Sequence, residues 1–215
     1  MISLNALLRQ HVTPVLKGEG LAKKGKAYRL RADNGDHAVL EIRRHPMACA
    51  MEVFFVRVAI VPTPEWAWNY RGCWEQEKTR LPTSAAEMVG WEVIPPAQVA
   101  YEPTEDGPSR GLWAYGQHID PASCGRALTE LLIKNTIPQM YRLLDREVLL
   151  EEIKEPTLDI RRTRPLGWAE VLLNVDRVSS AELEPLLTRV ERDYPVADEF
   201  IAWARQQVAE RVTRG

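Results

Sequence analysis

The sequence is poor in cysteine and lacks long apolar runs, and each shortage excludes a class of protein. Its three cysteines, Cys49, Cys73 and Cys124, are odd in number and form no CxxC pair. They predict free thiols in a reducing cytoplasm rather than a disulfide framework. No run approaches the roughly 18 apolar residues of a membrane span, and residues 1–17 lack the apolar core of a secretory signal. We therefore expect a cytoplasmic protein with no membrane partner.

The chain also lacks a charge excess and a familiar catalytic motif. A net charge of −2 argues against a general nucleic-acid binder, since neutralising phosphates normally requires a basic surplus. Neither GxSxG nor a Cys-His signature occurs. The apolar content of 45% in 215 residues is ordinary. It suffices for one large domain, or for one domain with a smaller extension.

Residues 51–61 are the most apolar segment, and the predicted fold is organised around them. Their sequence, MEVFFVRVAIV, is rich in Val, Ile and Phe and places apolar side chains on both parities. This pattern predicts a central strand with neighbours on each side and helices over at least one face. Two alternating runs, 27–31 and 37–43, precede it and flank Asn34-Gly35, a strong signal for a tight hairpin turn. A fourth strand is expected at 111–119.

Helical periodicity dominates both ends of the chain. Residues 3–17 predict an opening helix. Residues 125–154 predict a longer helical segment in which Pro138 implies either a kink or two helices in sequence. Ser179 and Glu182 have the spacing of a capping box at the start of a later helix. We therefore predict an α+β fold in which an antiparallel sheet of about four strands is packed by helices. The predicted division is an α+β domain over residues 1–155 and a helical extension over residues 156–215, packed on it.

Six segments carry a resemblance to a known family. They are LLRQHVTPVLKGEGLAKKGKAYRL, DNGDHAVLEIRR, FFVRVAIV, GCWEQEKTRL, GWEVIP and LLIKNTIPQMYRLLDREVLLEEI. Across roughly residues 1–155 the chain resembles the bacterial family of uncharacterised proteins designated DUF4304. The resemblance implies antiparallel strands flanked by helices, and no activity, cofactor or catalytic residue. That family often has a Gln and a Ser after its second strand. This chain has Ile42-Arg43-Arg44-His45-Pro46 there, so no role of those polar groups carries over.

Two arrangements of thiol and imidazole could support chemistry. His45 and Cys49 have a spacing that a zinc site can use, with Cys73 as a further ligand, but no second short-spaced pair completes four ligands. Cys124 stands at a predicted helix start, where a thiol pKa is lowered, and His118 is the nearest base. The simpler interpretation of each is a loop histidine or a small buried thiol. We therefore predict no metal, no cofactor and no identified catalytic residue.

Acidic side chains are scattered rather than paired. Glu75, Glu77, Glu87 and Glu92 could serve hydrolysis if two of them met in space. Nothing in their spacing fixes such a pair, and charge runs of this kind usually form solvated faces. We favour the solvated face and keep the acids as the basis of an alternative function.

The strongest binding signal is aromatic, and a basic cluster near the first hairpin accompanies it. That cluster consists of Lys23, Lys24, Lys26, Arg29 and Arg31, with Arg43 and Arg44 on the partner strand. Trp and Tyr are favoured where one side is dry and the other wet, as at protein interfaces. The alternatives are that the aromatic residues cover the core and that the basic residues protect a sheet edge. The candidate partner-binding residues are Trp66, Trp68, Tyr70, Arg71, Trp74, Arg43, Arg44 and His45.

These observations predict a non-enzymatic module that binds another protein, as an immunity-like or adaptor protein does. The alternative is a hydrolase or nuclease-like enzyme that uses the scattered acids and His118. Convergence of His118, Cys124 and a carboxylate in a cleft would favour the enzyme. Exposure of Trp66 and Trp68 on a surface would favour the binding module.

Overall fold

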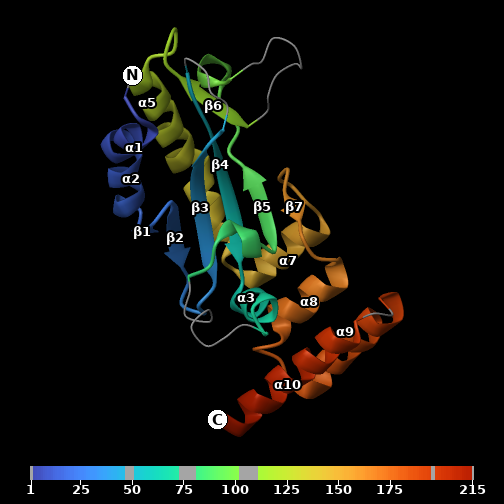
Figure 1. Cartoon of the computed structure of the whole chain (residues 1–215). Coiled ribbons are helices and arrows are strands. Elements are labelled where there is room, and N and C mark those ends of the chain that lie inside the picture. The colour runs from blue at the N-terminus through green and yellow to red at the C-terminus, as the bar shows by residue number, and fades with distance from the viewer. Residues whose placement is uncertain (1, 47–50, 73–80, 102–110, 195–196, 215) are drawn as a thin grey trace.

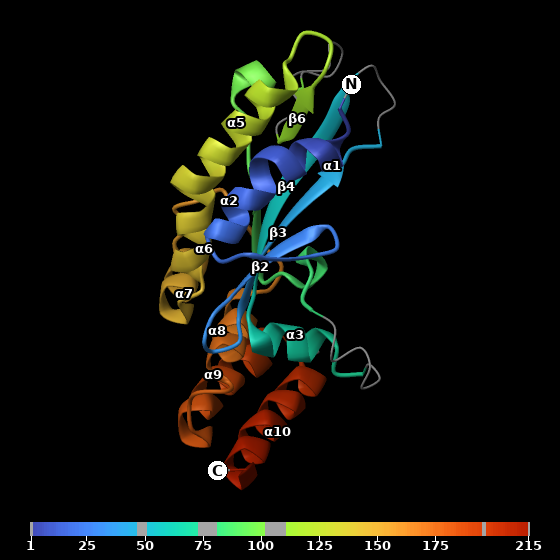
Figure 2. The same ribbon diagram turned by 90° about the vertical axis from the view of Figure 1, so that its left-hand side faces the viewer.

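A long antiparallel sheet forms the centre of the molecule, with helices along one face and a helical bundle at one end (Figure 1, Figure 2). This computed structural model describes residues 2–46, 51–72, 81–101, 111–194 and 197–214. The mixed composition of helices and antiparallel strands confirms the predicted α+β class.

The sheet has seven strands among the described residues, so the predicted number of about four is too low. Four of the strands have only two to four residues. Those at residues 22–24 and 161–162 show no apolar alternation in the sequence, and the apolar patch at residues 89–94 fits a short strand or a turn equally well, which is why the pattern does not count them. The strand order is β1-β2-β3-β4-β5-β7, with β6 also paired to β4. The strands are β1 (Ala22–Lys24), β2 (Ala27–Arg31), β3 (His37–Arg44), β4 (Glu52–Val61), β5 (Val89–Glu92), β6 (Leu112–Tyr115) and β7 (Arg161–Arg162).

Strand β4 is the central strand that its composition predicts. Along one edge its residues 54–61 pair with the whole of β3. Along the other edge its first half pairs with β6 and its second half with β5. Because both edges are hydrogen-bonded and most side chains on both faces are covered, neither parity of the strand needs to be polar.

Most helices lie against one face of the sheet, and the last three form the bundle with α3 (Figure 2). The helices are α1 (Leu4–Leu7), α2 (Thr13–Gly18), α3 (Thr63–Asn69), α5 (Pro121–Leu131), α6 (Ile137–Leu143), α7 (Arg146–Lys154), α8 (Leu166–Asn174), α9 (Ser180–Asp193) and α10 (Asp198–Arg214). Two π-helical turns, η1 (Leu8–Val12) and η4 (Leu132–Thr136), and two short 3-10 turns, η2 (Ser84–Ala86) and η3 (Ala97–Val99), complete them.

Two helical segments, α1–η1–α2 and α5–η4–α6, each contain an internal proline that follows a π-helical turn. Pro14 comes after η1 and Pro138 after η4. Proline has no N–H to donate, and its ring crowds the carbonyl four residues earlier. A wider turn at that point relieves both problems while the helix continues. The bend predicted at Pro138 therefore takes the form of a local widening.

The two faces of the sheet carry cores of different size. The helix-covered face holds the larger core, which includes the fully buried rings of Phe54 and Trp113. The opposite face has a small apolar cluster, centred on Val39 and Ala59, against which Trp66 and Tyr70 pack. The same face also carries the charged side chains of Glu41, Arg43 and Arg57. The small cluster therefore leaves part of one sheet face to polar groups.

A buried arginine joins the hairpin turn to the helical bundle. Arg146, at the start of α7, donates to both carboxylate oxygens of Asp36, with donor–acceptor distances of 2.7 and 2.8 Å. It also pairs with Asp176, in the α8–α9 connection. Asp36 in turn accepts the backbone N–H of Thr63 at 2.8 Å. Arg146 therefore links the sheet to residues on both sides of position 155. The division of the chain into two parts at that position stays a prediction.

A buried carboxylate also holds the chain as it leaves α7. Glu152 accepts hydrogen bonds from the side chain of Arg142 and from the backbone N–H groups of Thr157 and Leu158. Burial by itself would raise the pKa of Glu152, but these donors outweigh it and lower the pKa to about 2. The carboxylate is therefore charged throughout the neutral range.

We expect Glu152→Gln to lower the free energy of unfolding at pH 7 and to flatten its acid dependence. A carboxyl group whose folded-state pKa is depressed stabilises the fold above its unfolded value of about 4.5, and that stabilisation is lost as the pH falls towards 2. The loss is on the order of 2–3 kcal/mol. Urea unfolding of both proteins between pH 7 and pH 2.5 measures it. Parallel pH profiles for the two proteins would contradict the assignment.

Candidate functional site between α3 and α10

Helix α3 separates its aromatic residues onto two faces. Pro62 ends β4, and Pro64 occupies the first turn of α3, where a missing N–H costs nothing. Trp66 and Tyr70 are four residues apart and therefore share one face, with ring centroids separated by 4.0 Å. Both rings are partly exposed. Trp68 points the other way, so α3 contributes one aromatic pair to the surface and one ring to the core.

Trp68 lies inside the helical bundle and is only 5% exposed. Its ring centroid lies 5.1 Å from that of Phe200 and 5.3 Å from that of Trp203, in edge-to-face or tilted arrangements. Phe200 also stacks on Trp168, at a separation of 4.1 Å. Trp68 therefore anchors α3 to α10, and its ring is not available to a partner in this conformation.

A groove of about 680 Å³ runs between α3 and α10. Trp66, Ala67 and Tyr70 line it from α3 and the residue that follows, and Ala202, Trp203 and Gln206 line it from α10. The two alanines and the three aromatic rings make up the apolar part of the lining. Polar side chains stand at the ends.

Arg71 closes one end of the groove. Its guanidinium lies 3.5 Å from the ring centroid of Trp68 and donates to the Trp68 carbonyl at 2.9 Å. It also donates to the Glu199 carboxylate at 2.9 Å, and this hydrogen bond lowers the pKa of Glu199. The cation is therefore held in place by a ring, a carbonyl and a carboxylate.

The remaining predicted partner-binding residues do not join this groove. Arg43 and Arg44 end β3 and pair with Glu41 and Glu52, respectively. His45 follows them, and its backbone N–H bonds to Val53. Trp74 lies outside the described residues. The structure thus brings Trp66, Tyr70 and Arg71 together and places the basic residues elsewhere.

The features expected of an enzyme do not converge in the part of the chain that the structure describes. Cys124 is fully buried, and burial raises its pKa to about 12, so the helix start does not activate this thiol. His118 is exposed after β6 and forms no hydrogen bond with Cys124. Cys49 and Cys73 lie outside the described residues, which contain no cluster of three His, Cys, Asp or Glu side chains able to hold a metal.

Two acids on the sheet face opposite the helices, Glu41 and Glu87, form ion pairs with arginines. Glu87 is buried, and its pKa is raised by that burial even though Arg57 opposes the shift. Arg57 and Arg161 both pair with it. Burial also acts to raise the pKa of Glu41. In that case the hydrogen bonds from Ser84 and then from Arg43 lower it overall.

Sequence reasoning missed Glu41 and Ser84 as members of this group. The signal in the sequence was that Glu41 interrupts an apolar run in β3, which marks a buried charge. The two oxygens of Glu41 accept from the backbone N–H and hydroxyl of Ser84, at 3.2 and 2.8 Å. These contacts hold η2 on the sheet. Glu75 and Glu77 lie outside the described residues, and Glu92 stands at the end of β5.

No family model, no curated protein and no solved structure matches this chain. Membership of DUF4304 therefore stays a prediction that depends on the six segments quoted above. No described helix combines the length and the apolar character needed to cross a membrane.

Proposed function

We propose that this protein is a non-enzymatic binding module whose α3–α10 groove takes an amphipathic helix of another protein. The observation that carries the proposal is the Trp66–Tyr70 pair, which is partly exposed and lines a groove that alanines of both helices also line. Binding grooves between two helices typically receive the apolar face of a third. An immunity-like or adaptor role is consistent with such a surface.

The charges around the groove define the partner further. Arg71 is already paired with Glu199, whose side chain is 74% exposed. Glu210 stands at the other end of the groove. The exposure of Glu199 leaves its carboxylate accessible to a second cation beside Arg71. We therefore expect the partner helix to carry an apolar stripe flanked by a lysine or arginine.

Trp66→Ala should weaken such a complex at least tenfold, because rigid aromatic side chains at the centre of an interface carry much of its binding energy. A phage-displayed library of amphipathic helical peptides, selected on the unmodified protein, supplies defined ligands. Their dissociation constants are then measured by fluorescence anisotropy. Ala202→Arg, which adds a large charged side chain to the groove lining from an exposed position, should weaken the same peptides.

Val212→Ala provides the matched control. Val212 is 73% exposed on the same helix and does not line the groove. Its loss should leave the affinity within twofold. Selection that yields no peptide, or peptides that bind all four proteins alike, would contradict the proposal. Thermal unfolding of each variant shows that a loss of binding is not a loss of fold.

The alternative function is a hydrolase or nuclease-like enzyme that uses the scattered acids and His118. Among the described acids, Glu41 and Glu87 both lie on the sheet face opposite the helices, and their pKa values are shifted in opposite directions. The oxygens of both are already engaged by arginines or by Ser84. Groups held in this way stabilise a structure more readily than they transfer protons. We therefore favour the binding module.

A further inference from the structure

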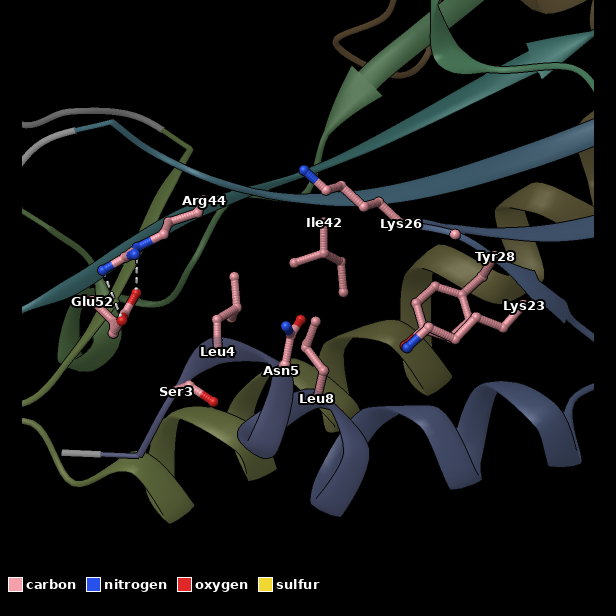
Figure 3. Close-up of a pocket in the computed structure, with 11 residues that line it drawn as sticks. Ser3, Leu4, Asn5, Leu8, Lys23, Lys26, Tyr28, Ile42, Arg44 and Glu52 are labelled. Carbon is pink, nitrogen blue, oxygen red and sulfur yellow. Dashed lines mark hydrogen bonds and ion pairs between the residues drawn. The ribbon is translucent and has the colours of Figure 1, made fainter.

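A second hollow lies on the helix-covered face of the sheet, away from the α3–α10 groove. It is formed by α1, the β1–β2 turn and the end of β3 (Figure 3). Its volume is about 270 Å³. It shares no residue with the α3–α10 groove. The two sites can therefore be tested independently.

The floor and one wall of this hollow are apolar. Leu4 and Leu8 face Ile42 across it, and the ring of Tyr28 stands at one side (Figure 3). All four side chains are buried. The Tyr28 hydroxyl is bonded to Thr13 at 2.7 Å. This part of the hollow therefore suits a hydrocarbon or aromatic group.

The rim carries three cations, of which only one is neutralised by a described residue. Arg44 pairs with Glu52, at 2.9 Å to one carboxylate oxygen and 2.8 Å to the other. Lys23 and Lys26 form no ion pair with a described carboxylate, and the Lys23 ammonium lies 5.1 Å from the centroid of the Tyr28 ring. The lining residues thus have a net charge of +2.

A tight turn positions these lysines. Strands β1 and β2 are joined by the two residues Gly25 and Lys26, and Gly25 has a φ of +65°. Two-residue hairpins of this kind require positive φ, which glycine adopts without strain. The carboxamide of Asn5 also projects into the hollow (Figure 3) and has no hydrogen-bond partner among the described residues. Its amide group adds a hydrogen-bond donor to the lining of the hollow.

We propose that this hollow binds a small organic anion with an apolar body, such as an aromatic or short alkyl phosphate or carboxylate. The apolar floor would receive the body, and Lys23, Lys26 and Asn5 would hold the anionic head. The volume is just below the range of about 300–1,000 Å³ typical of drug-sized ligands, so the ligand is small. The +2 charge of the lining favours an anion over a neutral or cationic ligand.

Protection of the sheet edge is the competing explanation for lysines on β1, and it makes a different prediction. Edge protection requires charge anywhere along the strand. Lys24 lies on the same edge strand but does not line the hollow. A ligand site should therefore depend on Lys23 and Lys26 and be indifferent to Lys24.

The test is an NMR titration of the full chain with phenyl phosphate, followed through the backbone amide signals. We expect saturable shifts confined to residues 3–8, 23–28 and 42–44. Phenylacetate in a parallel titration distinguishes a carboxylate head from a phosphate head. Benzyl alcohol, which lacks the charge, and inorganic phosphate, which lacks the body, should each bind at least tenfold more weakly.

Replacing both Lys23 and Lys26 with methionine should weaken phenyl phosphate at least tenfold, whereas Lys24→Met should change its affinity by less than twofold. Both lysines are exposed, so the double variant retains the apolar core, and its amide spectrum verifies the fold. Equal effects of the two variants would overturn the proposal in favour of general charge attraction. Inorganic phosphate binding as tightly as phenyl phosphate would overturn it, and so would the absence of saturable binding by both organic anions.

Discussion

Replacing Asp36 with alanine is expected to lower the free energy of unfolding by about 3–5 kcal/mol, the usual cost of removing one partner from a buried ion pair. The cost arises because the charge of Arg146 would remain buried without this counter-ion. Arg146 is 6% exposed, and its guanidinium donates to both oxygens of Asp36. Burial would lower the pKa of Arg146, but the hydrogen bonds to Asp36 and Asp176 raise it overall. The arginine therefore stays charged and loses its buried counter-ion.

Urea unfolding at pH 7 measures this loss, and Asp33→Ala is the control. Asp33 lies in the same turn but is exposed, so its removal should change the free energy of unfolding by no more than about 0.5 kcal/mol. Asp176→Ala should have a smaller effect than Asp36→Ala, because the Asp176 side chain is 42% exposed. A loss below 1 kcal/mol for Asp36→Ala would mean that water or Asp176 compensates Arg146.

The second large effect is expected for Trp68→Ala, which should lower the free energy of unfolding by about 3–5 kcal/mol. Trp68 is the ring through which α3 contacts Phe200 and Trp203 of α10. Its removal leaves a cavity in the helical bundle and also removes the ring beneath Arg71. Chemical unfolding, followed by far-ultraviolet circular dichroism because neighbouring tryptophans complicate fluorescence, measures the loss.

Trp66→Ala is the matched comparison, since the two tryptophans lie two residues apart on one helix. Trp66 is partly exposed and contacts Tyr70 and the small apolar cluster, so its removal should cost clearly less. Similar losses for both variants would show that Trp66 is also a core residue. That result would remove the main support for the proposed groove.

Local patterns in the sequence suffice for much of the architecture. The apolar composition of β4 predicts its central position, and Asn34-Gly35 predicts the hairpin, where Gly35 has a φ of +86°. Both hydrogen bonds of the capping box formed by Ser179 and Glu182 are present at the start of α9. These features depend on residues close in the chain, so periodicity and turn chemistry reveal them. Strand β7, with only two residues, carries no such pattern.

The sequence by itself therefore determined the central strand, the first hairpin and the helical segments near both ends of the chain. It also showed one cluster of aromatic residues and one of basic residues. Only the tertiary structure decided which of these side chains meet. Helix α10 begins more than a hundred residues after α3, yet its packing is what buries Trp68 and leaves Trp66 at a groove. Arg146 and Asp36 are 110 residues apart and form one ion pair. Burial and pairing depend on contacts between distant segments, and no local pattern encodes those contacts.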